Sequence, residues 1–268
     1  MTDLPVDEAS IPSRLGTSVT WDGAELVGHL EPLPATTIGS ALRASVVAFL
    51  VDAAAGLLVD SDPEAWTFTS DLSLRLPAAP APARLDAFTT VLRGGRRSVT
   101  ADVALVDETG APWGWSTIGF TRLERRPGDP DKPIIDLSQA SAIWEQIPPL
   151  DVPLRDAAGV RVLDATEGRV EIGLRPDLAN PAGALQGAIV ALLAEVATEE
   201  LATHNAGAPR MVTELDIRFL GQGRGGPVRS RAWCIGPPAD EVFRVELRDA
   251  GADDKLLTVA LARTRPLP

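Results

Sequence analysis

Residues 184–219 read ALQGAIVALLAEVATEELATHNAGAPRMVTELDIRF, and this stretch decides the fold because residues 41–76 repeat its pattern. The earlier copy reads ALRASVVAFLVDAAAGLLVDSDPEAWTFTSDLSLRL and aligns without a gap. Each copy has a long run rich in Ala, Leu and Val with one acid near its middle, Asp52 or Glu195. Each then ends in the strand-like pattern Leu-x-φ-Arg-φ, where φ is apolar. A tandem duplication of this kind places two related half-sites on one chain.

The residues around each copy follow the same order. Alternating segments at 17–31 and 160–175 predict two-strand hairpins, with turns at Asp22-Gly23 and Glu167-Gly168. The apolar runs predict helices at about 40–59 and 184–203 that are buried, because they leave almost no polar face. Further strands are expected at about 66–76, 84–94, 97–107, 114–123, 211–220, 227–236, 240–249 and 255–264.

A buried helix needs a cover, and in this chain only strands remain to provide one. The order therefore predicts an α+β fold, a double hotdog with two antiparallel sheets, each wrapped around a long central helix. We expect an N-terminal hotdog domain at 1–123, a Pro-rich and charged linker at 124–159, and a C-terminal hotdog domain at 160–268. The linker pattern predicts a short helix at about 137–147.

Composition excludes several classes of protein. A hydrophobic content of 45% is ample for a core, and a net charge of −12 disfavours nucleic acid as a partner. The single cysteine, Cys234, fits a reducing compartment. No apolar run reaches the roughly 18 residues of a membrane span, and the first residues do not resemble a signal peptide, so we expect a cytoplasmic protein.

A family resemblance rests on Asn180-Pro-Ala-Gly183-Ala-Leu-Gln186-Gly187-Ala188, then Glu195, then a strand beginning at Thr213. This pattern resembles the hotdog acyl-CoA thioesterases of the phenylacetate-pathway type, whose motif is Asn-x-x-Gly-x-x-His-Gly-Gly followed by an acid nine residues after the His. Gln186 replaces the His and Ala188 the second Gly. In the first half Thr37 stands at the Asn position, Arg43 at the His position and Ala44 at the Gly position. The segment Asp52-Ala-Ala-Ala-Gly56 is close to the family's Asp-x-Ala-x-Gly.

The resemblance implies hydrolysis of an acyl-CoA thioester, without a cofactor beyond the coenzyme A of the substrate. Such a reaction needs a carboxylate as base or nucleophile and donors for the developing oxyanion. Gly187 at a helix start is the natural backbone donor, and the Asn180 amide is a second contact. Gly187 and Glu195 are about 12 Å apart on one helix, so one helix cannot present both to one carbonyl. The acid is therefore expected from the other copy, packed antiparallel.

This rule sorts the candidates into two unequal sites. One combines Asn180 and Gly187 with Asp52, and it keeps every element of the family pattern except the His. The other combines Thr37 and Ala44 with Glu195, and it keeps only the acid. We expect a single competent site built on Asp52, with Glu195 as the acid of the weaker one. Glu195 could instead belong to a solvated face, because Glu199 and Glu200 follow it.

Other residues are candidates for substrate contact. Two equivalent strand arginines are candidates for the phosphates of coenzyme A. The candidate substrate-binding residues are Gln186, Gly183, Thr213, Gly56, Arg75 and Arg218. His29 and His204 occupy unrelated positions, and neither a metal cluster nor a catalytic triad is expected around them.

Two other functions stay open at this point. One is a non-catalytic protein that binds acyl-CoA or acyl chains, in which loss of the His-Gly-Gly signature marks lost turnover. The other is a hotdog enoyl-CoA hydratase, which the sequence disfavours because such enzymes pair an Asp with a His five residues away. A double hotdog imitates a dimer, so the protein could be monomeric or could pair again into a homo-oligomer. The length of the acyl group is not encoded in these patterns.

Overall fold

The computed structural model describes residues 10–60, 62–128, 131–133, 136–138, 144 and 147–268, and it has the expected α+β character. The elements of the first half are β1 (Thr17–Trp21), β2 (Leu26–Leu30), β3 (Thr37–Ile38), β4 (Ala41–Leu42), α1 (Ala44–Val59), β5 (Ala65–Arg75), β6 (Leu85–Gly94), β7 (Ser98–Asp107) and β8 (Pro112–Glu124). After the short helix α3 (Leu154–Ala158), the second half has β9 (Arg161–Asp164), β10 (Arg169–Ile172), α4 (Gly187–Ala206), β11 (Arg210–Phe219), β12 (Val228–Cys234), β13 (Val242–Asp249) and β14 (Lys255–Pro266).

The predicted order of hairpin, helix and strands is confirmed in both halves. Asp22 closes the first hairpin by accepting hydrogen bonds from the N–H groups of Ala24 and Glu25 at 2.8 Å. The helices begin three or four residues later than predicted, because the residues before them pair as strands instead. Ala41 and Leu42 form β4 against β3, and Leu185 bridges to Ala179. The linker helix predicted at about 137–147 falls largely outside the described residues.

The two halves share one sheet, so the expectation of two separate sheets is wrong. Twelve strands follow the order β1-β2-β6-β7-β8-β5-β11-β14-β13-β12-β10-β9, and every neighbouring pair is antiparallel. The halves join where β5 pairs with β11, with Asp71 opposite Arg218 and Arg75 opposite Glu214. Each of these strands follows its helix directly and would be a sheet edge without the other.

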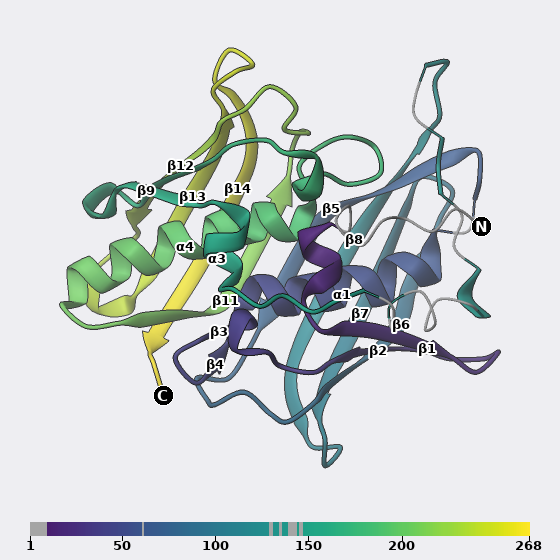
Figure 1. Ribbon diagram of the computed structural model, residues 1–268, viewed down its shortest axis with the longest axis horizontal. Coiled ribbons are helices and arrows are strands. Elements are labelled where there is room, and N and C mark those ends of the chain that lie inside the picture. Colours follow the sequence, from purple (N-terminus) through teal and green to yellow (C-terminus); the bar gives the residue numbers. More distant parts are fainter. Residues whose placement is uncertain (1–9, 61, 129–130, 134–135, 139–143, 145–146) are drawn as a thin grey trace.

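Helices α1 and α4 pack against each other on the same face of this sheet (Figure 1). Nearly every side chain of α4 up to Ala202 is buried, which confirms the prediction of a helix without a polar face. The start of α1 contacts the middle of α4, since the Ala44 N–H reaches Glu195, and Asp52 in α1 shares a pocket with Gly187 at the start of α4. The helices are therefore antiparallel. None of the helices in the described part of the chain is long and apolar enough to cross a membrane.

The sheet opens next to the junction of the halves. β5 pairs with β8 from Ala65 onward, but it pairs with β11 only from Asp71 to Arg75. The first half of β5 therefore diverges from the chain that leaves β11 at Phe219. This opening exposes the starts of α4 and of β5 to the same space, and it positions the site described next.

Candidate functional site

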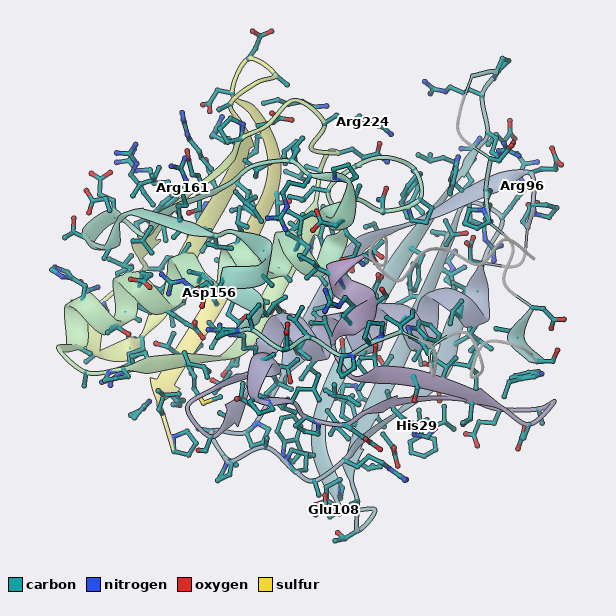
Figure 2. All side chains as sticks on the ribbon, in the orientation of Figure 1. His29, Arg96, Glu108, Asp156, Arg161 and Arg224 are labelled. Carbon is teal, nitrogen blue, oxygen red and sulfur yellow. The ribbon has the colours of Figure 1, made fainter. Side chains whose placement is uncertain are left out.

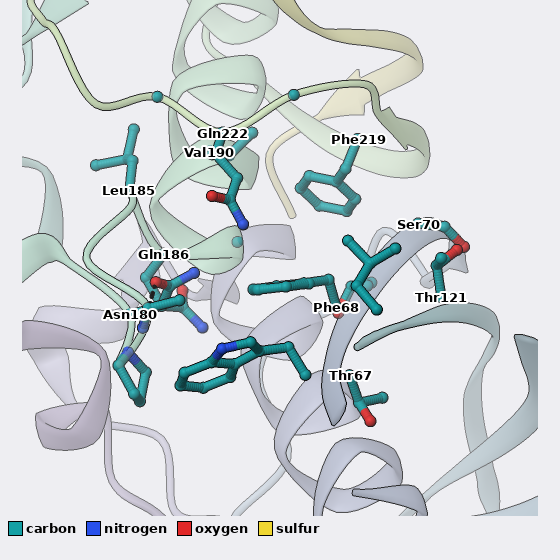
Figure 3. A pocket seen from close by; sticks show the side chains of 18 of the residues that line it. Thr67, Phe68, Ser70, Thr121, Asn180, Leu185, Gln186, Val190, Phe219 and Gln222 are labelled. Carbon is teal, nitrogen blue, oxygen red and sulfur yellow. Dashed lines mark hydrogen bonds between the residues drawn. The ribbon is translucent and has the colours of Figure 1, made fainter. Parts of the chain in front are cut away.

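A pocket of about 750 Å³ lies in this opening between the two halves of the chain. Its walls come from α1, β5, the end of β8, the turn before α4, the start of α4 and the loop after β11 (Figure 3). The residues lining it are Asp52, Asp60, Trp66, Thr67, Phe68, Thr69, Ser70, Thr121, Leu123, Glu124, Arg126, Lys132, Pro133, Asn180, Pro181, Ala182, Leu185, Gln186, Gly187, Val190, Phe219, Leu220, Gly221, Gln222, Gly223, Arg224 and Leu257. The structure thus brings Asp52, Asn180, Gln186 and Gly187 together.

Asp52 presents its carboxyl group to this pocket from the middle of α1. The Thr69 hydroxyl, on β5, donates a 2.5 Å hydrogen bond to Asp52 Oδ1. Burial raises the pKa of Asp52 above its ordinary value of 3.8, and the Thr69 hydrogen bond opposes that rise. Because Thr69 holds one carboxyl oxygen, the other oxygen, Oδ2, is left for a ligand or a water molecule. A carboxylate whose pKa is raised in this way is a stronger base than a solvent-exposed aspartate.

The start of α4 presents a backbone donor to the same space. Gln186 is the N-cap, and its Oε1 accepts from the Ala188 N–H at 2.5 Å. The N–H groups of Ile189 and Val190 donate to the Gln186 carbonyl. Within the described residues, the Gly187 N–H has no such partner. A Cβ on Gly187 would lie 3.8 Å from the Phe219 ring, an ordinary van der Waals contact, so the gap between the helix start and the ring is about one methyl group wide.

Asn180 is both a turn former and a pocket residue. Its Oδ1 accepts from the N–H groups of Ala182 and Ala184, both at 3.0 Å. With the oxygen engaged, the Nδ2 group is the part of the amide left to donate, and Asn180 lies beside Gln186 at the pocket wall (Figure 3). The turn therefore orients the donor that a carbonyl oxygen needs.

Apolar side chains form much of the remaining wall. The rings of Trp66 and Phe68 stack with their centroids 5.9 Å apart. Phe219 and Val190 line the pocket beside the start of α4 (Figure 3). An acyl group bound with its carbonyl at Gly187 would have these surfaces next to it.

The second predicted combination, at the start of α1, is closed. Glu195 has no solvent exposure, and its carboxylate accepts from the N–H groups of Ala44 at 2.7 Å and Ser45 at 3.3 Å. The Ser45 hydroxyl donates to Glu195 Oε2 at 2.5 Å. Glu195 is therefore not a free acid here, and the alternative of a solvated glutamate face is also wrong, because both Glu195 and Glu199 are buried.

One arginine serves both of these glutamates. Arg43 Nη1 lies 3.1 Å from Glu199 Oε2 and 3.6 Å from Glu195 Oε2. Burial raises the pKa of Glu199 to about 8, and the charge of Glu195 adds to the rise while Arg43 opposes it. Burial disfavours the charge of Arg43, but the carboxylates of Glu199 and Glu195 outweigh it and raise the Arg43 pKa. Burial therefore outweighs the pairing with Arg43 in setting the pKa of Glu199.

Five predicted substrate contacts lie outside the pocket lining. Arg75 forms a bidentate pair with Asp216 across the β5–β11 junction, both distances being 3.0 Å, and Arg218 donates to the carbonyl of its own neighbour Ile217. Thr213 is buried on β11. The other two are Gly56, within α1, and Gly183, at positive φ in the turn before α4.

The sequence analysis missed Thr69, which binds the Asp52 carboxyl, and Arg224, which lines the pocket mouth. The sequence could have indicated Thr69, because the aligned residue of the second half is the apolar Val212. The two copies of the repeat therefore differ in polarity at this position. Arg224 lies in the loop after β11 (Figure 2). Its guanidinium donates to the Ala182 carbonyl and to Gln222.

A hydrogen-bonded chain at His29 was not predicted from the sequence either. Its Nε2 lies 2.8 Å from the Thr20 hydroxyl and its Nδ1 lies 2.7 Å from Asp86. The group has the hydrogen-bond order Thr–His–Asp, which the unrelated sequence positions of the two histidines did not predict. The group lies on β1, β2 and β6 near one end of the sheet, and none of its residues lines the pocket (Figure 2).

Comparison with known proteins identifies the fold. No family model and no curated protein sequence matches the chain. Among solved structures, a tesB protein of Mycobacterium avium subsp. paratuberculosis is similar at 14% identity, over 96% of this chain and 98% of that one, with a TM-score of 0.65. An acyl-ACP thioesterase from Bacteroides thetaiotaomicron is similar at 12% identity, over 89% and 97%, with a TM-score of 0.59. A conserved protein of unknown function from Alicyclobacillus acidocaldarius, described as having a hot dog fold, is similar at 16% identity, over 98% and 99%, with a TM-score of 0.59. The chain has the hotdog fold.

Proposed function

We propose that the protein is an acyl-thioester hydrolase that acts on acyl-CoA substrates. The observation that carries the proposal is that a carboxyl group from one half, Asp52, lines the same pocket as a backbone donor from the other half, Gly187. Solved structures with the same fold include proteins described as acyl-ACP thioesterases and as a tesB protein, which supports this class of reaction.

We also propose that the chain is a tandem pair of hotdog units, with the boundaries expected from the sequence at 1–123 and 160–268. The repeated element order supports this division, and the shared sheet and antiparallel helices make the pair resemble a two-unit assembly. In such a pair each half supplies what the other half lacks. One competent site per chain follows, since the second combination is filled by Glu195.

In the proposed reaction the thioester carbonyl oxygen accepts hydrogen bonds from the Gly187 N–H and the Asn180 amide. These donors, together with the helix dipole, stabilise negative charge on that oxygen as the carbonyl carbon becomes tetrahedral. In one route Asp52 removes a proton from water as the water attacks the carbon, the C–S bond then breaks, and the protonated Asp52 returns the proton to the thiolate. In the other route Asp52 attacks the carbon itself and the C–S bond breaks, leaving a mixed anhydride and the thiolate. Water then hydrolyses the anhydride, which frees the acid and Asp52 and supplies the proton that the thiolate takes up.

Thr69 has a positioning role in this scheme. Its hydroxyl fixes Asp52 Oδ1, so Oδ2 is the oxygen that faces the substrate. The raised pKa of Asp52 makes its carboxylate a stronger base than a solvent-exposed aspartate. The acyl chain would lie along the apolar wall near Phe219 and Val190.

The test is thiol release from a series of acyl-CoA thioesters, measured with a thiol-reactive dye, for the wild type and the Asp52→Asn variant. We expect turnover by the wild type and a loss of at least about a hundredfold in kcat for the variant. Calorimetry with a non-hydrolysable acyl-CoA analogue runs in parallel. Tight binding without thiol release from any thioester would overturn the hydrolase and leave the non-catalytic acyl-CoA-binding protein.

A further inference from the structure

The closed cluster at the start of α1 has a geometry that the open pocket lacks. Glu195 is completely buried, and its two oxygens take the N–H groups of Ala44 and Ser45 and the Ser45 hydroxyl. The N-cap residue of α1, Arg43, gives no side-chain cap to its own helix. The first turn of α1 is therefore capped by a residue from another helix, whereas α4 carries its own cap in Gln186.

The internal alignment shows what this carboxylate replaces. Ala44 aligns with Gly187, and Glu195 aligns with Asp52. Gly187 lines the open pocket, and the proposed function places a thioester oxygen at its N–H. In the closed cluster the Glu195 oxygen, 2.7 Å from the Ala44 nitrogen, occupies the equivalent place. Glu195 thus stands where a ligand oxygen would stand in the related half-site.

We infer that Glu195 is an internal surrogate ligand that fixes the position of α1 and thereby holds Asp52 in the pocket that Gly187 lines. The inference rests on the proposed function for its catalytic consequence. Asp52 lies eight residues after Ala44 on the same helix, about 12 Å along its axis. Because the two helices pack side by side and antiparallel, a shift of α1 along α4 moves Ala44 relative to Glu195 and Asp52 relative to Gly187 by the same amount. A displacement of about 1 Å at a reacting group can cost a hundredfold in rate.

Within the part of the chain that the structure describes, no comparable hydrogen bond joins the two helices at the end where Asp52 and Gly187 lie. Asp52 hydrogen-bonds to Thr69 of its own half, and none of its hydrogen bonds within the described residues reaches α4. The described polar contacts between α1 and α4 therefore lie at the Glu195 cluster, which includes Arg43 and its ion pair with Glu199. Glu195 is a positioning residue in this account, since it does not touch the pocket.

The experiment compares Glu195→Ala, which removes the surrogate, with Glu195→Gln, which keeps an oxygen for the Ala44 N–H. Glu200→Ala is the matched control, because it removes a salt-bridged glutamate from the same helix, 2.6 Å from Arg155, without touching α1. Each variant is measured with and without sodium formate, whose carboxylate can enter the vacated space beside Arg43. Sodium chloride at equal ionic strength controls for salt.

Three readouts are taken: the thermal midpoint, kcat and KM for thiol release, and the titration of the Asp52 carboxyl carbon by NMR. For Glu195→Ala we expect kcat to fall about ten- to hundredfold with KM changed less than threefold. We expect the Asp52 titration midpoint to move toward its ordinary value. Formate is expected to raise the thermal midpoint of this variant alone and to restore both other readouts. Glu195→Gln is expected to stay within about threefold of the wild type in kcat.

The outcomes separate this inference from the proposed function. If the wild type releases no thiol, the proposed function fails, and the Asp52 titration with its formate rescue still decides the inference. If Glu195→Ala loses stability while the Asp52 titration and kcat match the control variant, Glu195 is only structural and the inference is overturned. If Glu195→Ala does not fold, Glu195→Asp takes its place, because its shorter side chain withdraws from Ala44, and an unchanged Asp52 titration together with an unchanged kcat in Glu195→Asp overturns the inference as well.

Discussion

Lengthening the pocket acid by one methylene group is expected to close the site. In the related half-site a glutamate reaches the backbone N–H groups of Ala44 and Ser45 at 2.7 and 3.3 Å. Asp52 stands at the aligned position, and its side chain is shorter by about 1.5 Å, one C–C bond. The Asp52→Glu variant should therefore place its carboxylate on the Gly187 N–H and exclude the thioester oxygen from it.

The size of the effect follows from the contacts available. Gln186 already occupies the Ala188 N–H, so the new carboxylate gains one backbone donor instead of two. A hydrogen bond to a charged group contributes about 1.5–3 kcal/mol, which a substrate must overcome before it can bind productively. At 1.36 kcal/mol for each factor of ten, kcat/KM falls by roughly 10- to 150-fold from this blockade alone. The same contact caps α4 and should raise the unfolding free energy by about 1 kcal/mol.

The assay pairs thiol-release kinetics with denaturant unfolding for wild type, Asp52→Glu and Asp52→Asn. The signature of closure is that Asp52→Glu loses activity while it gains stability. An Asp52→Glu protein that keeps more than half of the wild-type kcat/KM would refute the reasoning. So would one that loses stability, because the glutamate would then not have reached the start of α4.

Three further predictions concern single side chains. Thr69→Val copies the residue found at the aligned position, Val212, and removes the hydrogen bond that opposes the rise in the Asp52 pKa. The pKa of Asp52 should therefore rise further, and the acidic limb of the kcat/KM profile should move to higher pH. A profile that stays in place would show that Thr69 does not act on Asp52. The pKa of Glu199 is raised from 4.5 to about 8, so the folded state binds a proton that the unfolded state releases, and stability should fall as pH rises from about 4.5 to about 8. Glu199→Gln should flatten that dependence in unfolding experiments, and an unchanged slope would assign it to other groups. Arg75→Ala should leave KM for acyl-CoA within about twofold, because Arg75 pairs with the β11 acids outside the pocket. An exposed ion pair of this kind contributes at most about 1 kcal/mol. A tenfold rise in KM would support the phosphate-binding role that the sequence predicted for Arg75.

Much of the fold follows from local sequence patterns. The hairpins, the two buried helices and the strands after them could be predicted, because alternation and helical periodicity record which residues face the core. The meeting of Asp52 with Gly187 also followed, since eight residues of helix separate Gly187 from Glu195 and so force the acid to come from elsewhere. Both groups line one pocket in the structure.

The pairing of β5 with β11 could not be predicted in the same way. Either strand could have stayed a sheet edge, and only contacts between the halves decide that they pair. Whether the Arg75 guanidinium is available to a ligand depends on that strand pairing, because its partner Asp216 lies across the junction. A pattern that repeats in each half therefore says little about residues at the boundary between them.

The inequality of the two acids depends on distances too small for a sequence pattern to show. Aspartate and glutamate are conservative replacements, yet Glu195 reaches the opposing helix start and Asp52 does not. Capping by Gln186 has the same character, since an amide at the position of the expected His satisfies the helix start directly. To predict such contacts, the relative positions of the two helices would have to be known to within about one bond length.

The central claim is that one half supplies the acid and the other half supplies the carbonyl donor at a single open site. Its most direct test is single-turnover thiol release by Asp52→Asn and Glu195→Gln, measured side by side on the same acyl-CoA. The account predicts a loss of at least about a hundredfold for Asp52→Asn and less than about threefold for Glu195→Gln. Equal losses in the two variants, or a larger loss for Glu195→Gln, would contradict it.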